Sequence, residues 1–131
     1  MKRFLCVALT LIMLLGLCGC SKTSVKADQD VTLNFVFDGR DIHVTLTAEE
    51  AETVIDILDG NIYDPIASGV PSCGFDKDIS LTVGSQSYAI ARDTCSTIQD
   101  LGNLRYFNVT QEENDYIHAL FEKYGGLFPC I

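Results

Sequence analysis

The sequence predicts an α+β fold in which two β-hairpin–helix units form a four- to five-stranded, mostly antiparallel sheet with two helices on one face. Two stretches of alternating apolar and polar residues surround short turns, which is typical of hairpins with one buried face. Each hairpin is followed further along the chain by a helix-capping motif and by apolar residues at helical spacing. Placing both helices on one face of the sheet is the simplest way to bury all of these apolar stripes.

The composition limits the classes of function. The chain has 131 residues and 47% of them are hydrophobic, so it can fold as one domain of ordinary size. It contains 9 basic and 18 acidic residues, and this balance disfavours nucleic acid as a partner because phosphate contacts need clustered Lys and Arg. The sequence has neither a glycine-rich phosphate loop nor a complete metal-binding motif, so we expect no cofactor and no metal.

The first residues have the pattern of an export signal. Lys2 and Arg3 precede an uncharged, mostly apolar stretch from Phe4 to Cys18, which is shorter than the roughly 20 residues that a membrane-spanning helix needs. The stretch ends in Leu17-Cys18-Gly19-Cys20, an aliphatic residue and two small residues before a cysteine. This segment resembles the lipobox of bacterial lipoproteins.

The resemblance implies that residues 1–19 are a signal peptide, cleaved after Gly19, and that Cys20 carries a diacylglyceryl group with fatty acyl chains such as palmitate. It also implies that the membrane is a partner through this anchor, on the extracytoplasmic side of the cell membrane or of an outer membrane. Residues 20–30 are polar and without periodicity, which predicts a flexible tether to a single small α+β domain over 31–131.

The chain from Val31 to Leu46 is predicted to form the first hairpin. Apolar residues occupy the odd positions as far as Phe37, and the alternation resumes after Asp38-Gly39, a strong two-residue turn signal. Pairing Phe37 with Arg40 brings the apolar residues of both strands to one face. Thr47-Ala48-Glu49-Glu50 then forms a capping box, and apolar residues at helical spacing predict a helix up to Gly60.

A second unit repeats this order. Alternating apolar residues surround Gly84-Ser85, and pairing Val83 with Gln86 sets Leu81 opposite Tyr88 and Ile79 opposite Ile90. A short fifth strand is expected at Arg105–Val109. Thr110-Gln111-Glu112-Glu113 is a second capping box, followed by an apolar stripe at helical spacing.

The uncovered face of the sheet and one long loop provide the candidate binding residues. Outward positions of the predicted strands carry small polar side chains, Asn34 and His43 among them, which either solvent or a partner could cover. The stretch 60–72 has no clear periodicity, and long loops are often functional or mobile. Its apolar residues, Tyr63 included, fold back on the core or meet a partner.

Three cysteines remain in the domain after the lipidation residue. An exported domain permits disulfides, and extending the second hairpin brings Cys73 and Cys95 close together, so we expect this pair to form. Cys130 is the alternative partner of Cys95.

These features favour a lipid-anchored, non-catalytic binding or accessory module of the cell envelope, with an envelope or extracellular protein as its partner. One alternative is a thiol-dependent enzyme or redox protein. Cys95 or Cys130 would be its nucleophile, and His118 with Asp93 or Asp115 supplies the residue types, without a recognised local signature. The other alternative is an inhibitor of an extracellular enzyme.

Overall fold

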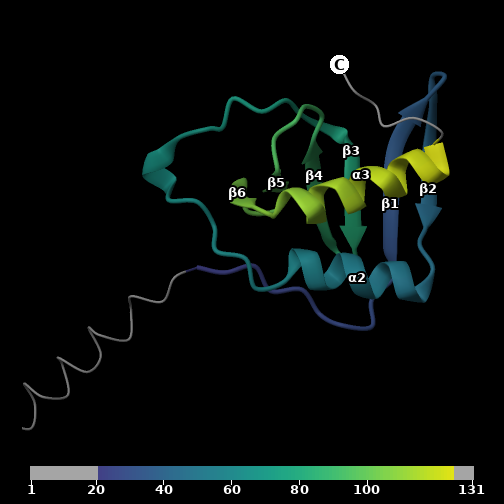
Figure 1. Ribbon diagram of the computed structural model, residues 1–131, viewed down its shortest axis with the longest axis horizontal. Helices are drawn as coiled ribbons and strands as arrows, with labels where there is room; N and C mark the ends of the chain where they lie inside the picture. Colours follow the sequence, from purple (N-terminus) through teal and green to yellow (C-terminus); the bar gives the residue numbers. More distant parts are fainter. Residues whose placement is uncertain (1–20, 126–131) are drawn as a thin grey trace, which may run out of the picture.

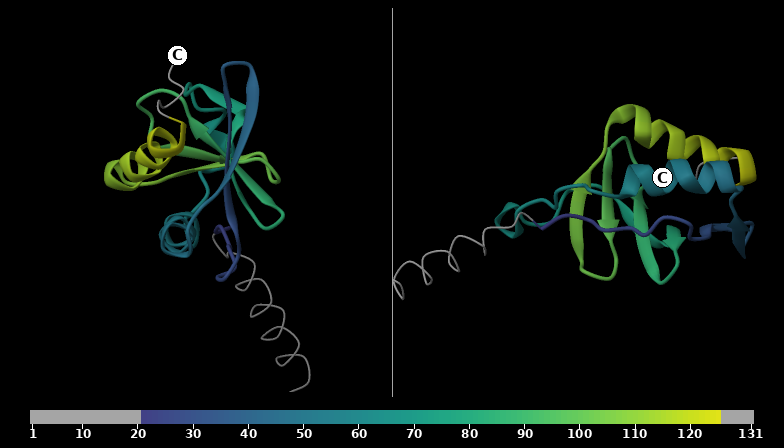
Figure 2. Two further views of the ribbon diagram at one scale, coloured as in Figure 1. Left: turned by 90° about the vertical axis from the view of Figure 1, so that its right-hand side faces the viewer. Right: turned by 90° about the horizontal axis from the view of Figure 1, so that it is seen from below.

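Two helices cover one face of an antiparallel sheet in the computed structural model, which describes residues 21–125 (Figures 1 and 2). The predicted signal peptide, the predicted lipidation residue Cys20 and the alternative disulfide partner Cys130 lie outside the described residues. The elements are β1 (Val31–Phe37), β2 (Arg40–Thr45), α2 (Ala48–Leu58), the short 3₁₀ turn η1 (Ile66–Ser68), β3 (Phe75–Val83), β4 (Gln86–Ala91), β5 (Thr97–Asp100), β6 (Arg105–Asn108) and α3 (Gln111–Gly125).

The six strands follow the order β2-β1-β3-β4-β5-β6, and every neighbouring pair is antiparallel. The α+β class and the cover of one face by both helices are therefore confirmed. The predicted fifth strand is β6, and the strand that the sequence pattern missed is β5. With only four residues and Ile98 as its one aliphatic member, β5 is too short to show an alternation.

The first hairpin has the predicted register, with Phe37 opposite Arg40 and Leu33 opposite Val44. Asp38 and Gly39 both have left-handed backbone conformations, with φ angles of 51° and 70°. This is the geometry of a type I′ turn, whose twist matches that of the strands it joins. The Asp-Gly pair therefore sets the register that directs the apolar side chains toward the helices.

The second hairpin follows its predicted register only near the turn. Leu81 lies opposite Tyr88 as expected, and the regular pairing continues to Ser80 with Ala89. Pairing then resumes at Phe75, after extra residues in β3, so the predicted pairing of Ile79 with Ile90 does not continue the ladder. The extra residues include Asp76-Lys77-Asp78, in which the Asp78 N–H donates to Asp76 Oδ1 at 2.9 Å. This local hydrogen bond competes with the ladder and produces the irregularity.

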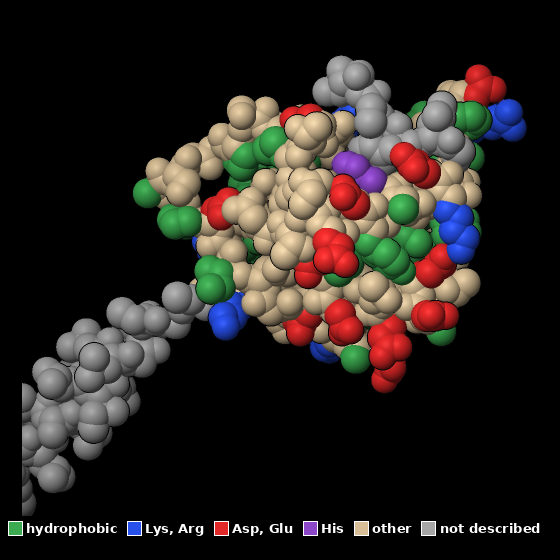
Figure 3. Space-filling view, in the orientation of Figure 1, with side chains coloured by type: hydrophobic (Ala, Val, Ile, Leu, Met, Phe, Trp, Pro, Cys, Tyr) green, Lys and Arg blue, Asp and Glu red, His purple; other side chains and the backbone are tan. Residues whose placement is uncertain are grey.

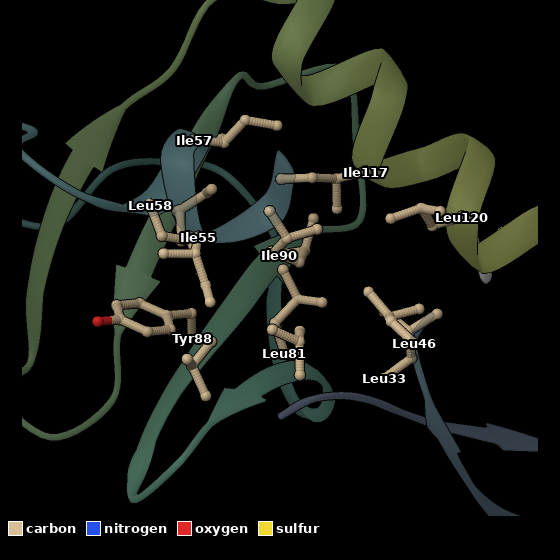
Figure 4. Packing of buried hydrophobic residues seen from close by; sticks show 14 of the residues in the cluster. Leu33, Leu46, Ile55, Ile57, Leu58, Leu81, Tyr88, Ile90, Ile117 and Leu120 are labelled. Atoms are coloured by element: carbon tan, nitrogen blue, oxygen red, sulfur yellow. The ribbon is translucent and has the colours of Figure 1, made fainter. Parts of the chain in front are cut away.

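The hydrophobic core lies between the sheet and the two helices (Figure 4). Leu33, Leu81 and Ile90 from the central strands are fully buried, as are Leu58 of α2 and Ile117 of α3. Full burial of an aliphatic side chain contributes roughly 1.5–3 kcal/mol. Within residues 21–125, neither helix combines the length and the apolar character that crossing a membrane requires.

Glu50 joins the two helices. One of its carboxylate oxygens, Oε2, accepts hydrogen bonds from the Thr47 N–H at 3.1 Å, which completes the predicted capping box of α2, and from the Tyr124 hydroxyl at 2.7 Å. The other, Oε1, accepts from Lys123 Nζ at 2.6 Å. The hydrogen bond from Lys123 is the main reason why the pKa of Glu50 falls from its ordinary value of 4.5 to about 2, although burial opposes the shift.

The segment predicted as a flexible tether packs against the domain from its first described residues. Thr23 and Val25 are buried, at 3% and 7% exposure. The Thr23 hydroxyl donates to the Leu58 carbonyl at 2.7 Å, and the Val25 N–H donates to Asp59 Oδ1 at 2.8 Å. The Leu58 carbonyl lies at the end of α2, where carbonyl groups have no helical partner, and the Thr23 hydroxyl supplies its donor. Because the segment is mostly polar, the sequence pattern did not predict that Thr23 and Val25 point inward on either side of the exposed Ser24.

The outer edge of β6 is covered by the chain that follows α2. Tyr63 forms an antiparallel bridge with Phe107, and the Asp64 N–H donates to a backbone carbonyl of β6 at 2.7 Å. On its other side, this segment is bridged by Lys22 to Ile62. The sheet therefore continues past β6 through two short pieces of chain that the sequence did not identify as strands.

We expect Glu50→Gln to lower the free energy of unfolding by about 1–2 kcal/mol at pH 7, since the Lys123 side chain is 57% exposed and solvent screens the pair. Because the folded pKa lies below the ordinary value, the stabilisation is complete above about pH 4.5 and is lost as the pH falls toward 2. Denaturant unfolding of the unmodified protein and the variant at pH 7 and pH 2.5 measures the difference in stability, which should be smaller at pH 2.5.

The matched control is Glu52→Gln, which removes an exposed carboxylate from the same helix. This control should unfold like the unmodified protein. Equal stability of the Glu50→Gln and Glu52→Gln variants at pH 7 would contradict the assignment.

Candidate functional site

Two of the three predicted binding residues meet on the sheet face that the helices leave uncovered. His43 Nδ1 lies 2.8 Å from Asn34 Oδ1. Asn34 Nδ2 donates to Thr82 Oγ1 at 2.9 Å and lies 3.3 Å from Ser80 Oγ. Thr82 Oγ1 in turn lies 3.2 Å from Ser87 Oγ. This polar ladder crosses the adjacent strands β2, β1, β3 and β4.

Tyr63, the third predicted binding residue, does not join the polar ladder. It belongs to the hydrophobic core with 8% exposure, and its ring packs edge-on against Phe107 at a centroid distance of 6.1 Å. Its hydroxyl donates to Asp100 Oδ2 at 2.5 Å, and the Arg105 guanidinium lies 4.8 Å from the ring centroid. Burial is the main cause that raises its pKa. Tyr63 therefore folds back on the core. Of the three predicted binding residues, only Asn34 and His43 belong to the polar ladder.

The polar ladder satisfies much of its own hydrogen-bonding capacity. The Asn34 amide uses both its oxygen and its nitrogen on neighbouring side chains. A network of this kind holds its members in place, and solvent supplies what remains at an exposed residue such as His43. Nothing in the ladder requires a ligand.

The predicted disulfide between Cys73 and Cys95 is confirmed, with Cα atoms 6.0 Å apart. Asp93 holds the loop beside it, because Oδ1 accepts from the Cys95 N–H at 3.0 Å and Oδ2 from the Gly74 N–H at 3.1 Å. These two backbone donors lower the pKa of Asp93. Ligand atoms of Cys73, Asp93 and Cys95 lie within 4.8 Å of one another, but the disulfide occupies both sulfur atoms.

A pocket of about 410 Å³ lies between this disulfide-closed loop and α3. We call it the α3 pocket. Figure 3 shows a histidine over α3 with acidic side chains beside it. The lining residues are Arg92, Asp93 and Thr94 from the loop, and Gln111, Asn114, Asp115 and His118 from α3.

Asn114 is the unusual member of this lining. It is only 1% exposed, and within residues 21–125 neither its Oδ1 nor its Nδ2 has a hydrogen-bond partner. A buried polar group without a partner costs about 1–3 kcal/mol. Counted from the capping threonines Thr47 and Thr110, Asn114 stands where α2 has Ala51. An amide thus occupies a core position that the corresponding helix fills with a methyl group.

His118 completes the polar wall of the α3 pocket. Burial lowers its pKa, and the opposing effects of Asp115, Glu122 and the Ala91 backbone are smaller. The imidazole is therefore neutral near pH 7, with one donor and one acceptor nitrogen. Asp115 accepts a hydrogen bond from Gln111 Nε2 at 2.8 Å. Asn114 and His118 thus give the pocket neutral donors and acceptors beside the charged side chains of Arg92, Asp93 and Asp115. The neighbouring Cys95 is bonded to Cys73 instead of being a thiol.

Two other features carry less weight than the α3 pocket. A pocket of about 460 Å³ between residues 27–30 and α2 is lined by the carboxylates of Asp28, Asp30, Glu52 and Asp56, all of them exposed to solvent. Tyr88 has a buried hydroxyl without a partner among the described residues, and burial raises its pKa. It lines neither pocket.

The comparisons with known proteins do not identify a relative. No family model matches the sequence, and no curated protein or solved structure matches the chain.

We predict that replacing Cys73 and Cys95 together by serine lowers the free energy of unfolding by about 3 kcal/mol, because the 22-residue separation makes loop closure in the unfolded chain entropically significant. Denaturant unfolding with and without dithiothreitol tests this. The reductant should lower the stability of the unmodified protein to that of the double variant and leave the variant unchanged. Insensitivity of the unmodified protein to reductant would refute a stabilising role.

Proposed function

We propose that this protein is a lipid-anchored lipoprotein of the extracytoplasmic side, that its domain is a non-catalytic binding module, and that the α3 pocket is its binding site. The lipobox-like segment ending at Cys20 supports the anchor. The Cys73–Cys95 disulfide supports export, since disulfides persist in oxidising compartments and are rare in reducing ones. It also favours binding over thiol catalysis, because it takes up the predicted nucleophile Cys95.

The observation that carries the binding role is the buried, unpartnered amide of Asn114 in the lining of the α3 pocket. Buried polar groups without a partner are rare in folded proteins, and departures from such rules are expected at functional or strained sites. A ligand that supplies one acceptor and one donor would remove the penalty of this amide. The binding free energy would then include the hydrogen bonds that the Asn114 amide lacks in the unliganded protein.

The charged side chains of the lining are engaged within the protein, since Arg92 pairs with Asp76, Asp93 accepts from two backbone N–H groups and Asp115 accepts from Gln111. The buried amide of Asn114 therefore favours a ligand that contains an amide. A carboxamide pairs with another amide through one N–H donated and one carbonyl accepting, and Asn114 provides both groups. The neutral imidazole of His118 adds a further donor or acceptor. A volume of about 410 Å³ falls within the range of small-molecule pockets, roughly 300–1,000 Å³. A short peptide segment, such as an exposed loop of an envelope protein, has this size and chemistry.

Asn114→Leu tests the site. In the unliganded protein it should raise the free energy of unfolding by about 1–3 kcal/mol, because an unsatisfied amide gives way to an apolar side chain at a core position. Asn34→Leu is the matched control, since Asn34 has three side-chain partners and its loss should destabilise the fold. Denaturant unfolding of both variants measures the two effects, which should have opposite signs.

The ligand class is tested with N-acetylglycinamide, a small probe that carries two amide groups. Titration of the ¹⁵N-labelled mature protein should move the side-chain amide resonance of Asn114 and the backbone amide resonances of the pocket lining in a saturable way. In the Asn114→Leu protein, the backbone amide resonances of the lining should show no saturable shift. Destabilisation by Asn114→Leu together with no response to the probe would refute the binding site.

Cys20→Ser tests the anchor. Without the sulfur that receives the diacylglyceryl group, the protein should leave the membrane fraction or fail to be processed, because a single polar residue cannot replace the acyl chains. Cell fractionation and the mass of the native protein measure this. A replacement of the neighbouring Ser21 by Ala is the control and should stay in the membrane fraction. Unchanged fractionation of Cys20→Ser would exclude the anchor.

A further inference from the structure

The described chain begins with a segment that is fixed to one end of the domain. The Tyr63 N–H donates to the Ser21 carbonyl at 3.2 Å, and Lys22 forms a backbone bridge with Ile62. The Thr23 N–H donates to the Asn61 carbonyl at 2.8 Å, and Thr23 itself is buried. Ser21, the first described residue, is thereby held at this end of the domain.

Exposed apolar side chains gather in the loop that holds this segment. We call residues 60–72 the end loop. Ile62, Ile66 and Val70 are 58%, 84% and 79% exposed. Figures 1 and 2 show the end loop at the same end of the molecule as the start of the described chain, and Figure 3 shows hydrophobic side chains there. Large exposed apolar groups that lie together mark an interaction surface.

The end loop is also almost free of charge in a strongly acidic protein. Its one charged residue is Asp64, whereas the chain as a whole has a formal net charge of −9. The Asp64 carboxylate accepts from Asn108 Nδ2 at 3.2 Å, and its backbone carbonyl accepts from Arg105 at 2.9 Å, so it is held toward β6. The basic residue nearest to this end in sequence, Lys22, is exposed. Such a surface suits the interface of a bilayer better than the carboxylate-rich surface of α2 does.

We propose that the end loop is the membrane-facing surface of this protein, with Ile62, Ile66 and Val70 in contact with the bilayer. The inference rests on the proposed lipid anchor at Cys20. An anchor attached one residue before a docked segment leaves no slack, so the end of the domain beside that segment must face the lipid. The domain therefore has one orientation on the membrane and does not move freely on a tether.

The test uses the lipidated mature protein, purified in detergent and reconstituted into phosphatidylglycerol–phosphatidylcholine vesicles with brominated acyl chains. Ile66→Cys, in a Cys130→Ser background, carries an environment-sensitive fluorophore in the end loop. Arg40→Cys, in the same Cys130→Ser background, carries the same fluorophore beside the β1–β2 turn. Figure 1 shows this turn at the other end of the molecule. Both sites are surface positions, since Ile66 is 84% exposed and the Arg40 side chain 78%. Both variants should therefore fold.

We expect brominated lipid to quench the fluorophore at position 66 at least severalfold more strongly than the one at position 40. Equal, weak quenching at both positions would overturn the inference. So would a label at position 66 that is shielded from water without being quenched, because in this purified sample a second copy of the protein would then cover the end loop. The mass of the same samples separates the two proposals. A lipidated Cys20 with an unquenched label refutes the orientation alone, whereas an unmodified Cys20 refutes the anchor and the inference with it.

Discussion

The apolar face of the sheet must be buried from water, and both helices of the described chain pack against it. Their buried faces meet the inward residues of the strands, and Glu50 ties one helix to the other through Lys123 and Tyr124. With the helices engaged there, the opposite face is left to small polar side chains that bond to each other. The features that point to function consequently lie where this arrangement ends: at the first turns of α3, at the disulfide-closed loop, and at the edge of β6.

Local patterns predicted what local forces determine. The Asp38-Gly39 turn, the two capping boxes and the strand alternation were sufficient for the fold class, the first register and the helix starts. The disulfide followed from extending a hairpin. Packing between distant segments was not predictable in this way. The short strand β5, the burial of Tyr63 and the docking of Thr23 all depend on partners more than thirty residues away or on strands too short to show a period.

The candidate site illustrates the same division. Asn34 and His43 were predicted from alternation and do meet, because neighbouring strands place opposite residues together. Asn114 was missed, although a signal existed: the comparison of the two capping boxes sets it against Ala51, a mismatch at a core position. A polar residue in a buried stripe can be satisfied in many ways, and only the folded chain reveals that no partner among residues 21–125 reaches this one.

The cover over β6 has a consequence for how this protein behaves at high protein concentration. Strands at the border of a sheet present unpaired amides and carbonyls that recruit other chains into aggregates. Here one border is closed by the protein's own segments around Tyr63 and Lys22, and the other, β2, begins with the charged residues Arg40 and Asp41. Lys22, two residues after the proposed acylation point, covers the outer edge of the segment around Ile62. Proteolytic removal of the first described residues would therefore expose an unpaired strand edge and promote self-association, as well as separate the domain from its proposed anchor.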